Sequence, residues 1–96
     1  MLRERWIEHY GPLVTEQLAP ERRYSVVRVG LAEFAYSTYD AYVRALGHAW
    51  SAGFIPQPLG AIPGERLLDV APNLRGVDAD LTNLRGSDVE RSSRFS

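Results

Sequence analysis

The stretch from Arg23 to Trp50 limits the possible folds of this chain more than any other part of the sequence. Residues 24–29 are rich in Val and Tyr, which suit a pleated, half-buried strand. Gly30 interrupts this run, and a second apolar run follows over residues 31–36. The pattern predicts a tight hairpin that turns at Val29-Gly30, although favoured two-residue turns use Asn-Gly or Gly-X and Val disfavours positive φ.

The alternation of side chains along the two predicted strands assigns them to the two faces of a sheet, because successive residues point in opposite directions. On the first strand, one face holds Tyr24, Val26 and Arg28, and the other holds Ser25, Val27 and Val29. On the second strand, one face holds Ala32, Phe34 and Tyr36, and the other holds Leu31, Glu33 and Ala35. Phe34 and Tyr36 are therefore expected to share a face.

A capped amphipathic helix follows the hairpin. The sequence Ser37-Thr38-Tyr39-Asp40 resembles a capping box, with Ser37 as the cap and Asp40 three residues on. The pattern predicts a helix over residues 38–50, which Gly53 can terminate. Its apolar face is expected to hold Tyr39, Tyr42, Val43, Leu46 and Trp50.

The same stretch also permits a helical interpretation, which would make the protein mainly α. One long helix over residues 21–52 would carry an apolar stripe of Val27, Leu31, Phe34, Thr38, Tyr42 and Leu46. A second long helix over residues 2–18 would precede it, and an irregular C-terminal arm would follow. The VVRV run and the internal capping box favour the strands, because a capping box in the middle of a helix has no role. The sequence alone leaves both interpretations open.

The flanking segments have weaker patterns. Residues 2–18 place apolar side chains at three- and four-residue intervals and predict a helix, kinked at Gly11-Pro12 where a backbone donor is missing. Four of the six prolines fall within residues 56–72. We therefore expect three parts, which are a compact α+β core over 1–55, an arm with little regular structure over 56–86 and a disordered tail over 87–96.

Composition excludes several classes of function. The formal net charge is -1, and no segment forms the basic patch that non-specific nucleic-acid binding requires. The chain has no Cys, which excludes disulfides, thiol catalysis and Cys-based zinc sites and fits a cytoplasmic protein. No apolar run approaches the roughly 18 residues of a membrane span.

The candidate ligands for a metal or cofactor are few and scattered. His9 and His48 lack the spacing of a metal site, and each is expected to be a surface or core residue. Asp78 and Asp80 form a loose acidic pair that a solvated loop explains. There is no Gly-rich phosphate loop and no Gly-x-Ser-x-Gly elbow. The sequence therefore predicts no metal site and no cofactor.

Three segments together carry a family pattern. They are Arg5-Trp6 with Glu8 to Val14, then Arg22-Arg23-Tyr24 with Val26, and then Gly30 to Phe34 with Ser37 and the helix from Tyr39 to Leu46. Over about residues 3–46 their order and residue types resemble the EthD-like family. The resemblance implies ferredoxin-like subunits that pair as a dimeric α+β barrel around a cavity. It also implies a small accessory protein, or a small cofactor-free enzyme, that acts on hydrophobic and often aromatic molecules.

Two of the chain's departures from the family pattern bear on its start and on the candidate site. The family begins with a strand and this chain begins with the first helix, so a start upstream of Met1 is an alternative. The His that directly precedes Gly-Pro-Leu in the family is replaced by Tyr10, and His9 lies one place earlier. One place on a helix is a rotation of about 100°, so His9 does not occupy the family's position.

These observations lead to one expected function and one alternative. The expected fold is α+β, a ferredoxin-like half-barrel without an obvious first strand, in a homodimer with no nucleic-acid or membrane partner. The expected function is to bind a hydrophobic small molecule in an aromatic-lined cleft, or to transform it without a cofactor. Tyr10 would be the leading polar group and His9 an acid or base, and Trp6, Phe34 and Tyr36 would form the walls. The alternative is a non-catalytic, mainly helical protein–protein interaction module.

Overall fold

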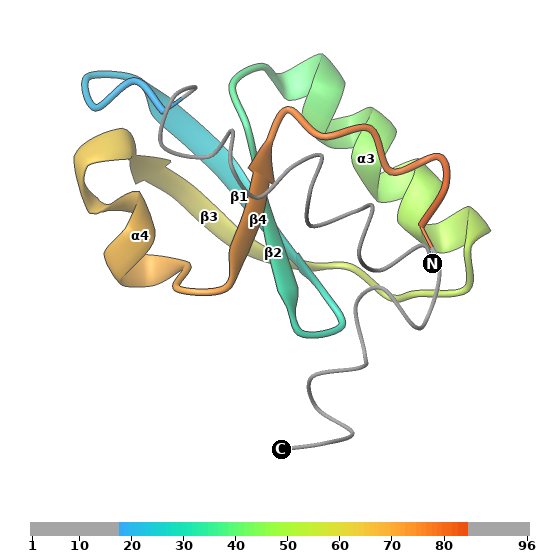
Figure 1. Ribbon diagram of the computed structural model, residues 1–96. Helices are drawn as coiled ribbons and strands as arrows, with labels where there is room; N and C mark the ends of the chain where they lie inside the picture. Colours follow the sequence, from blue (N-terminus) through green and yellow to red (C-terminus); the bar gives the residue numbers. More distant parts are fainter. Residues whose placement is uncertain (1–17, 85–96) are drawn as a thin grey trace.

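A four-stranded mixed sheet organises residues 18–84, the part of the chain that the computed structural model describes (Figure 1). In spatial order its strands are β3 (Gln57–Pro63), β1 (Arg23–Val29), β2 (Ala32–Tyr36) and β4 (Leu74–Val77). Strand β1 is antiparallel to both β2 and β3, whereas β2 and β4 are parallel. The helical elements are α3 (Tyr39–Ser51), the 3₁₀ helix η1 (Gly64–Arg66) and α4 (Leu67–Val70).

The predicted α+β class is confirmed, and the mainly α alternative is wrong for the described residues. The segment on which the two interpretations differed, residues 24–36, is a hairpin rather than part of a long helix. Several predictions fall outside residues 18–84, namely the kinked helix up to residue 17, the tail over 87–96 and the site residues Trp6, His9 and Tyr10. None of the helices within residues 18–84 has both the length and the apolar character needed to cross a membrane.

The hairpin turns one residue later than predicted. Val29 pairs with Ala32, so Gly30 and Leu31 form the two-residue loop. Gly30 has a φ of 62°, and Asp78 is the one non-glycine residue of the described part with positive φ. The loop is therefore of the Gly-X type, in which the glycine alone takes positive φ. The turn predicted at Val29-Gly30 is wrong because it would put a β-branched residue where glycine is needed.

Apolar side chains are buried on both faces of the sheet. On the α3 side, the cluster contains Val27, Val29, Ala32, Phe34 and Tyr36 from the hairpin with Ala45 and Ala49 from α3. On the opposite side, Tyr24, Val26 and Ala35 pack with Leu67, Ala71 and Val77. This division confirms the predicted alternation. Full burial of one Val, Leu or Phe side chain contributes about 1.5–3 kcal/mol, so the two clusters hold α3 and α4 on either side of the sheet (Figure 1).

Strand β3 lies in the segment that the sequence analysis assigned to an arm with little regular structure. Residues 57–77 of that predicted arm, 56–86, instead hold two strands and two short helical segments. The prolines account for the difference, because β3 lies at an edge of the sheet, where Pro58 and Pro63 need not donate a ladder hydrogen bond. The strand also bulges beside Gly60, whose φ is 103°. An edge position thus accommodates a strand that is rich in proline and glycine.

Helix α3 begins one residue later than predicted and has a different cap. Thr38 is the N-cap, and its Oγ1 accepts a hydrogen bond from the backbone N–H of Ala41 at 3.2 Å. Ser37, the predicted cap, instead binds a carboxylate in the segment after β4. The helix ends before Gly53, which has a φ of 93°, and this confirms the predicted terminator.

Candidate functional site

Helix α3 carries two apolar rows, of which the row of alanines faces the sheet and the other is largely exposed. The inner row consists of Ala41, Ala45 and Ala49, and the last two are buried. The outer row consists of Tyr39, Val43, Leu46 and Trp50, whose spacing of four, three and four residues puts them on one face. Tyr39 is 73% exposed, Trp50 60% and Val43 44%. We call these four residues the outer face of α3.

The sequence analysis assigned the larger side chains to the buried face, and this is wrong for Tyr39, Val43 and Trp50. Two aromatic side chains of β2 are buried in the cluster beneath the helix. Small residues opposite large ones complete such a layer, so the alanine row faces the sheet. Tyr42 and Leu46 lie at the edge of the cluster and are half-buried.

Two features adjoin the outer face of α3. The ring centroid of Tyr39 lies 6.1 Å from that of Tyr42, with the ring planes at 46°, so aromatic surface continues from the outer face toward the core. Gly47 lies one turn beyond Val43, and a Cβ atom there would have no neighbour within 4 Å. Glycine within a helix costs roughly 0.5–1 kcal/mol relative to alanine. No contact within residues 18–84 requires glycine at this position.

A pocket of about 310 Å³ lies on another side of α3, between the helix and the segment after β4. Its lining residues are Tyr36, Ala41, Arg44, Ala45, His48, Asp78, Ala79, Asp80 and Thr82. Five of these nine residues are charged or polar, three are alanines, and Tyr36 is the one large aromatic residue. The pocket therefore differs from the aromatic-lined cleft that the sequence predicted.

Asp78 holds one wall of this pocket in place. Its carboxylate accepts hydrogen bonds from the backbone N–H and the hydroxyl of Ser37, both at 2.8 Å. Its own N–H donates to the carbonyl of Ala35 at 2.7 Å. The φ of 57° is left-handed, a conformation that Asp adopts more readily than most residues. These bonds tie the segment after β4 to the start of α3, which is a structural role.

His48 and Asp80 face each other across the pocket without a close contact. Their Nδ1 and Oδ1 atoms are 3.9 Å apart, which is longer than a hydrogen bond. The same oxygen accepts a hydrogen bond from the backbone N–H of Thr82 at 3.1 Å, and the Asp80 side chain is 66% exposed. Within residues 18–84, no group of three His, Cys, Asp or Glu side chains could hold a metal ion. The pair does not have the geometry of an oriented general base.

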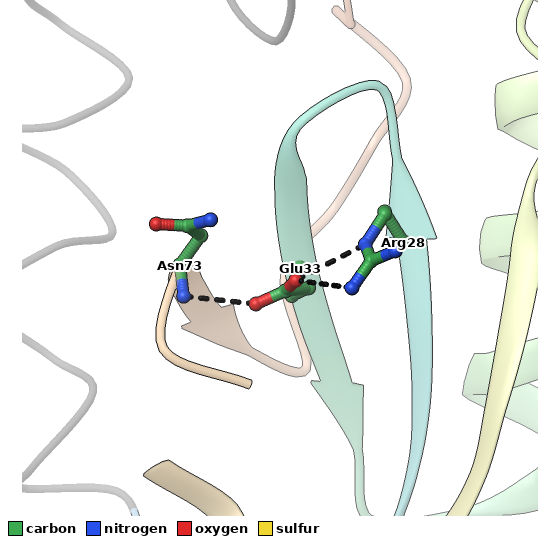
Figure 2. A network of polar contacts seen from close by, with 3 residues as sticks. All are labelled: Arg28, Glu33 and Asn73. Atoms are coloured by element: carbon green, nitrogen blue, oxygen red, sulfur yellow. Dashed lines mark hydrogen bonds and ion pairs between the residues drawn. The ribbon is translucent and has the colours of Figure 1, made fainter. Parts of the chain in front are cut away.

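The buried carboxylate of Glu33 belongs to a polar network near the turn of the β1–β2 hairpin (Figure 2). Glu33 is 1% exposed. Its Oε2 accepts a hydrogen bond from Nε of Arg28 at 3.1 Å and lies 3.1 Å from a second guanidinium nitrogen. Its Oε1 accepts from the backbone N–H of Asn73 at 2.8 Å. Both oxygens are bound, so the network joins β1, β2 and the approach to β4 rather than forming a reactive site.

The structure places the predicted cleft residues in two different situations. Phe34 and Tyr36 lie on the same face of β2, as predicted, but both are buried beneath α3. The Tyr36 hydroxyl donates to a backbone carbonyl in the segment after β4 at 3.0 Å. Trp6, His9 and Tyr10 lie outside the described residues, so their proposed roles stay predictions.

Sequence reasoning missed the convergence of His48 with Asp78 and Asp80. It treated the histidine as isolated and the two carboxylates as a solvated loop. The parallel pairing of β2 with β4 brings these distant segments together. Residues 74–77 read LRGV, which is neither an apolar run nor an alternation, so the sequence carries no clear signal of a strand there.

Comparisons of the chain with protein-family models, curated proteins and solved structures found no match. The EthD-like resemblance and the dimeric barrel that it implies therefore stay predictions.

Proposed function

We propose that this protein is a non-catalytic interaction module that binds another protein chain through the outer face of α3. The observation that carries the proposal is the inverted burial of the helix. Alanines face the sheet, whereas Tyr39, Val43 and Trp50 face solvent. Trp and Tyr are the residues that contribute most often to the energy of protein interfaces. An exposed row of this kind on a small domain supports a binding role.

The exposed aromatic area sets the scale of this interaction. An aromatic side chain has about 150–250 Å² to bury. At the exposed fractions of Tyr39 and Trp50, roughly 200–300 Å² of aromatic surface is open to a partner. At about 25 cal/mol per Å², its burial contributes on the order of 5–8 kcal/mol before the costs of association. This is enough for a reversible complex once the remaining contacts are added.

The small-molecule function from the sequence has less support in the described residues. Phe34, one of its predicted walls, is in the core. The pocket beside His48 has charged and polar residues among its alanines, and Tyr36 is its one large aromatic residue. Binding, or cofactor-free transformation, of a hydrophobic molecule would depend on residues 1–17, which carry Trp6, His9 and Tyr10. We also propose a cytoplasmic location for this module, because the sequence has no Cys.

Site-specific photo-crosslinking in cells tests the proposal. A photoreactive phenylalanine analogue at Val43 is expected to give a discrete crosslinked band. The same analogue at Leu68, which is 45% exposed on α4, serves as the matched control and should give little product. Replacing Trp50 by Ser should abolish the Val43 product by removing the main apolar contact. Equal crosslinking from Val43 and Leu68, or a Val43 product that persists in the Trp50→Ser variant, would refute the proposal.

A further inference from the structure

We infer that the partner is a second copy of this chain, docked antiparallel against the outer face of α3. This inference rests on the proposed function and specifies its partner. The outer face reads aromatic, aliphatic, aliphatic, aromatic along the helix, at Tyr39, Val43, Leu46 and Trp50. A two-fold axis through the middle of the row would place Tyr39 opposite the Trp50 of the second copy. It would also place Val43 opposite Leu46, so that the same contacts occur twice, as an isologous interface requires.

The position of this axis agrees with the extent of the helix. Helix α3 runs from Tyr39 to Ser51, so the centre of the row is also close to the centre of the helix. Two copies related in this way overlap along their full helical length, and their helix dipoles run in opposite directions. Arg44 lines the pocket on another side of the helix, so the row itself carries no charge. The pairing therefore brings no like charges into the centre of the contact.

Gly47 supplies an independent argument for a second helix at this face. It lies next to Val43 on the helix surface, one turn along. Its absent side chain leaves space that no atom of the described residues fills. Glycine weakens a helix, and no contact within residues 18–84 gives a reason for it here. Close approach of another backbone is a use for such a position, and the antiparallel arrangement puts that backbone beside Gly47.

The other surfaces of the sheet are less suited to self-association. Tyr24, Val26 and Ala35, which face away from α3, are each at most 1% exposed. On the edge formed by β3, Pro58 cannot donate a hydrogen bond and the strand bulges. A dimer that pairs sheet faces, as the EthD-like resemblance implies, would need apolar sheet surface that these residues do not expose. Within residues 18–84, the outer face of α3 exposes both of the large aromatic side chains, Tyr39 and Trp50, that stand among the exposed large hydrophobic residues.

The expected dimer is weak and reversible. Two copies together would bury roughly 400–600 Å² of aromatic surface from Tyr39 and Trp50. With the aliphatic pair and the rim, the interface stays near or below about 1,200 Å², the range of transient complexes. We therefore expect dissociation in the micromolar range, with monomer and dimer in exchange.

Sedimentation equilibrium of the full chain from about 1 µM to about 1 mM measures this association. Trp50→Ser should weaken it at least tenfold, and Leu68→Ser on α4 should leave it within twofold. Gly47→Gln is the sharper variant, because one copy has room for the side chain and glutamine is the better helix former. It should raise the unfolding midpoint at low concentration and still weaken association at least tenfold. No change in association in the Trp50→Ser or Gly47→Gln variant would overturn the inferred interface.

Fluorescence of Trp50 separates failure of this inference from failure of the proposed function. The chain has two Trp residues, so a Trp6→Phe background isolates Trp50. The inference expects acrylamide quenching of Trp50 to fall as protein concentration rises. If the protein is a monomer at every concentration and Trp50 stays accessible, the inference of a second copy is overturned. The outer face of α3 is then still free to bind another protein. A monomer whose Trp50 is shielded at every concentration would show that the chain covers its own helix, and both proposals would fail.

Discussion

Replacing Arg28 by Met should destabilise the protein more than most single substitutions on a strand do. The Glu33 carboxylate is 1% exposed, and the guanidinium of Arg28 supplies two of its three close polar contacts. Met keeps the apolar stem of the side chain but removes the charge. The carboxylate would then be buried with only the backbone N–H of Asn73 as partner.

The structure sets the magnitude of this effect. Removing one partner of a fully buried ion pair costs about 3–5 kcal/mol, because an uncompensated charge is left behind. The Arg28 side chain is 39% exposed, so water partly replaces it and the pair is worth less than a fully buried one. We therefore expect a loss of about 2 kcal/mol in the free energy of unfolding. For a domain of this size that corresponds to a fall of roughly 8–16 °C in the unfolding midpoint.

A double-mutant cycle with Glu33→Gln tests whether the charge is the cause. The glutamine oxygen can still accept from Asn73, and a neutral amide does not need a guanidinium partner. Arg28→Met should therefore cost about 1 kcal/mol less in the Glu33→Gln background than in the natural sequence. Arg23→Met is the matched control, because Arg23 lies on the same strand and binds an exposed carbonyl. It should change stability by no more than about 0.5 kcal/mol.

Urea unfolding followed by circular dichroism at pH 7 gives these values. Protein concentration should be low and equal throughout, because self-association through α3 would add stability by mass action. Two results would refute the reasoning. One is a cost for Arg28→Met no larger than that for Arg23→Met. The other is additivity of the Arg28 and Glu33 changes within about 0.5 kcal/mol, since it would mean that the two side chains do not interact.

Three further substitutions test local features of the fold by the same urea assay. Thr38→Ala should cost about 1 kcal/mol by removing the N-cap of α3, and a cost near zero would mean that another residue caps the helix. Gly64→Ala should cost at least about 2 kcal/mol, because its Cβ would collide with the backbone carbonyl of Ala19; a neutral result would contradict that close approach. Asp78→Ala should cost about 2–3 kcal/mol by losing both hydrogen bonds to Ser37 and placing alanine at positive φ. Asp78→Asn should cost less, because asparagine has nearly the same shape and also tolerates positive φ. Equal costs for the two variants would contradict this reason.

The hairpin could be predicted from local sequence because its signals are local. A period of two in Tyr24–Val29 fixed which side chains share a face, and Gly30 located the turn to within one residue. Strands β3 and β4 were missed because their pairing is not local. Pro58 and Pro63 disfavour a strand in the middle of a sheet. Strand β3 is possible because it lies at the edge of the sheet. Strand β3 takes that edge position because the opposite side of β1 is already paired with β2.

The candidate site was harder to predict than the fold for the same reason. His48 lies on α3, and Asp78 and Asp80 follow a strand that pairs in parallel with β2. No spacing rule within the sequence connects these segments. Phe34 and Tyr36 were placed on the correct face of their strand, but alternation alone does not say what covers that face. The cover is α3, which places Phe34 in the core and leaves Tyr36, though buried, among the lining residues of the pocket beside His48.

The burial of the two faces of α3 was equally hard to predict from the sequence, and it bears directly on the proposed function. The sequence contains two apolar rows on one helix, and hydrophobicity alone ranks the larger row as the buried one. Packing reverses that ranking, because a sheet face that presents large aromatic side chains is best completed by alanines such as Ala45 and Ala49. Tyr39, Val43 and Trp50 of the larger row are then left without a buried position inside the described residues. The proposed protein partner would cover them, and the glycine at position 47 of the same helix leaves room for a close approach.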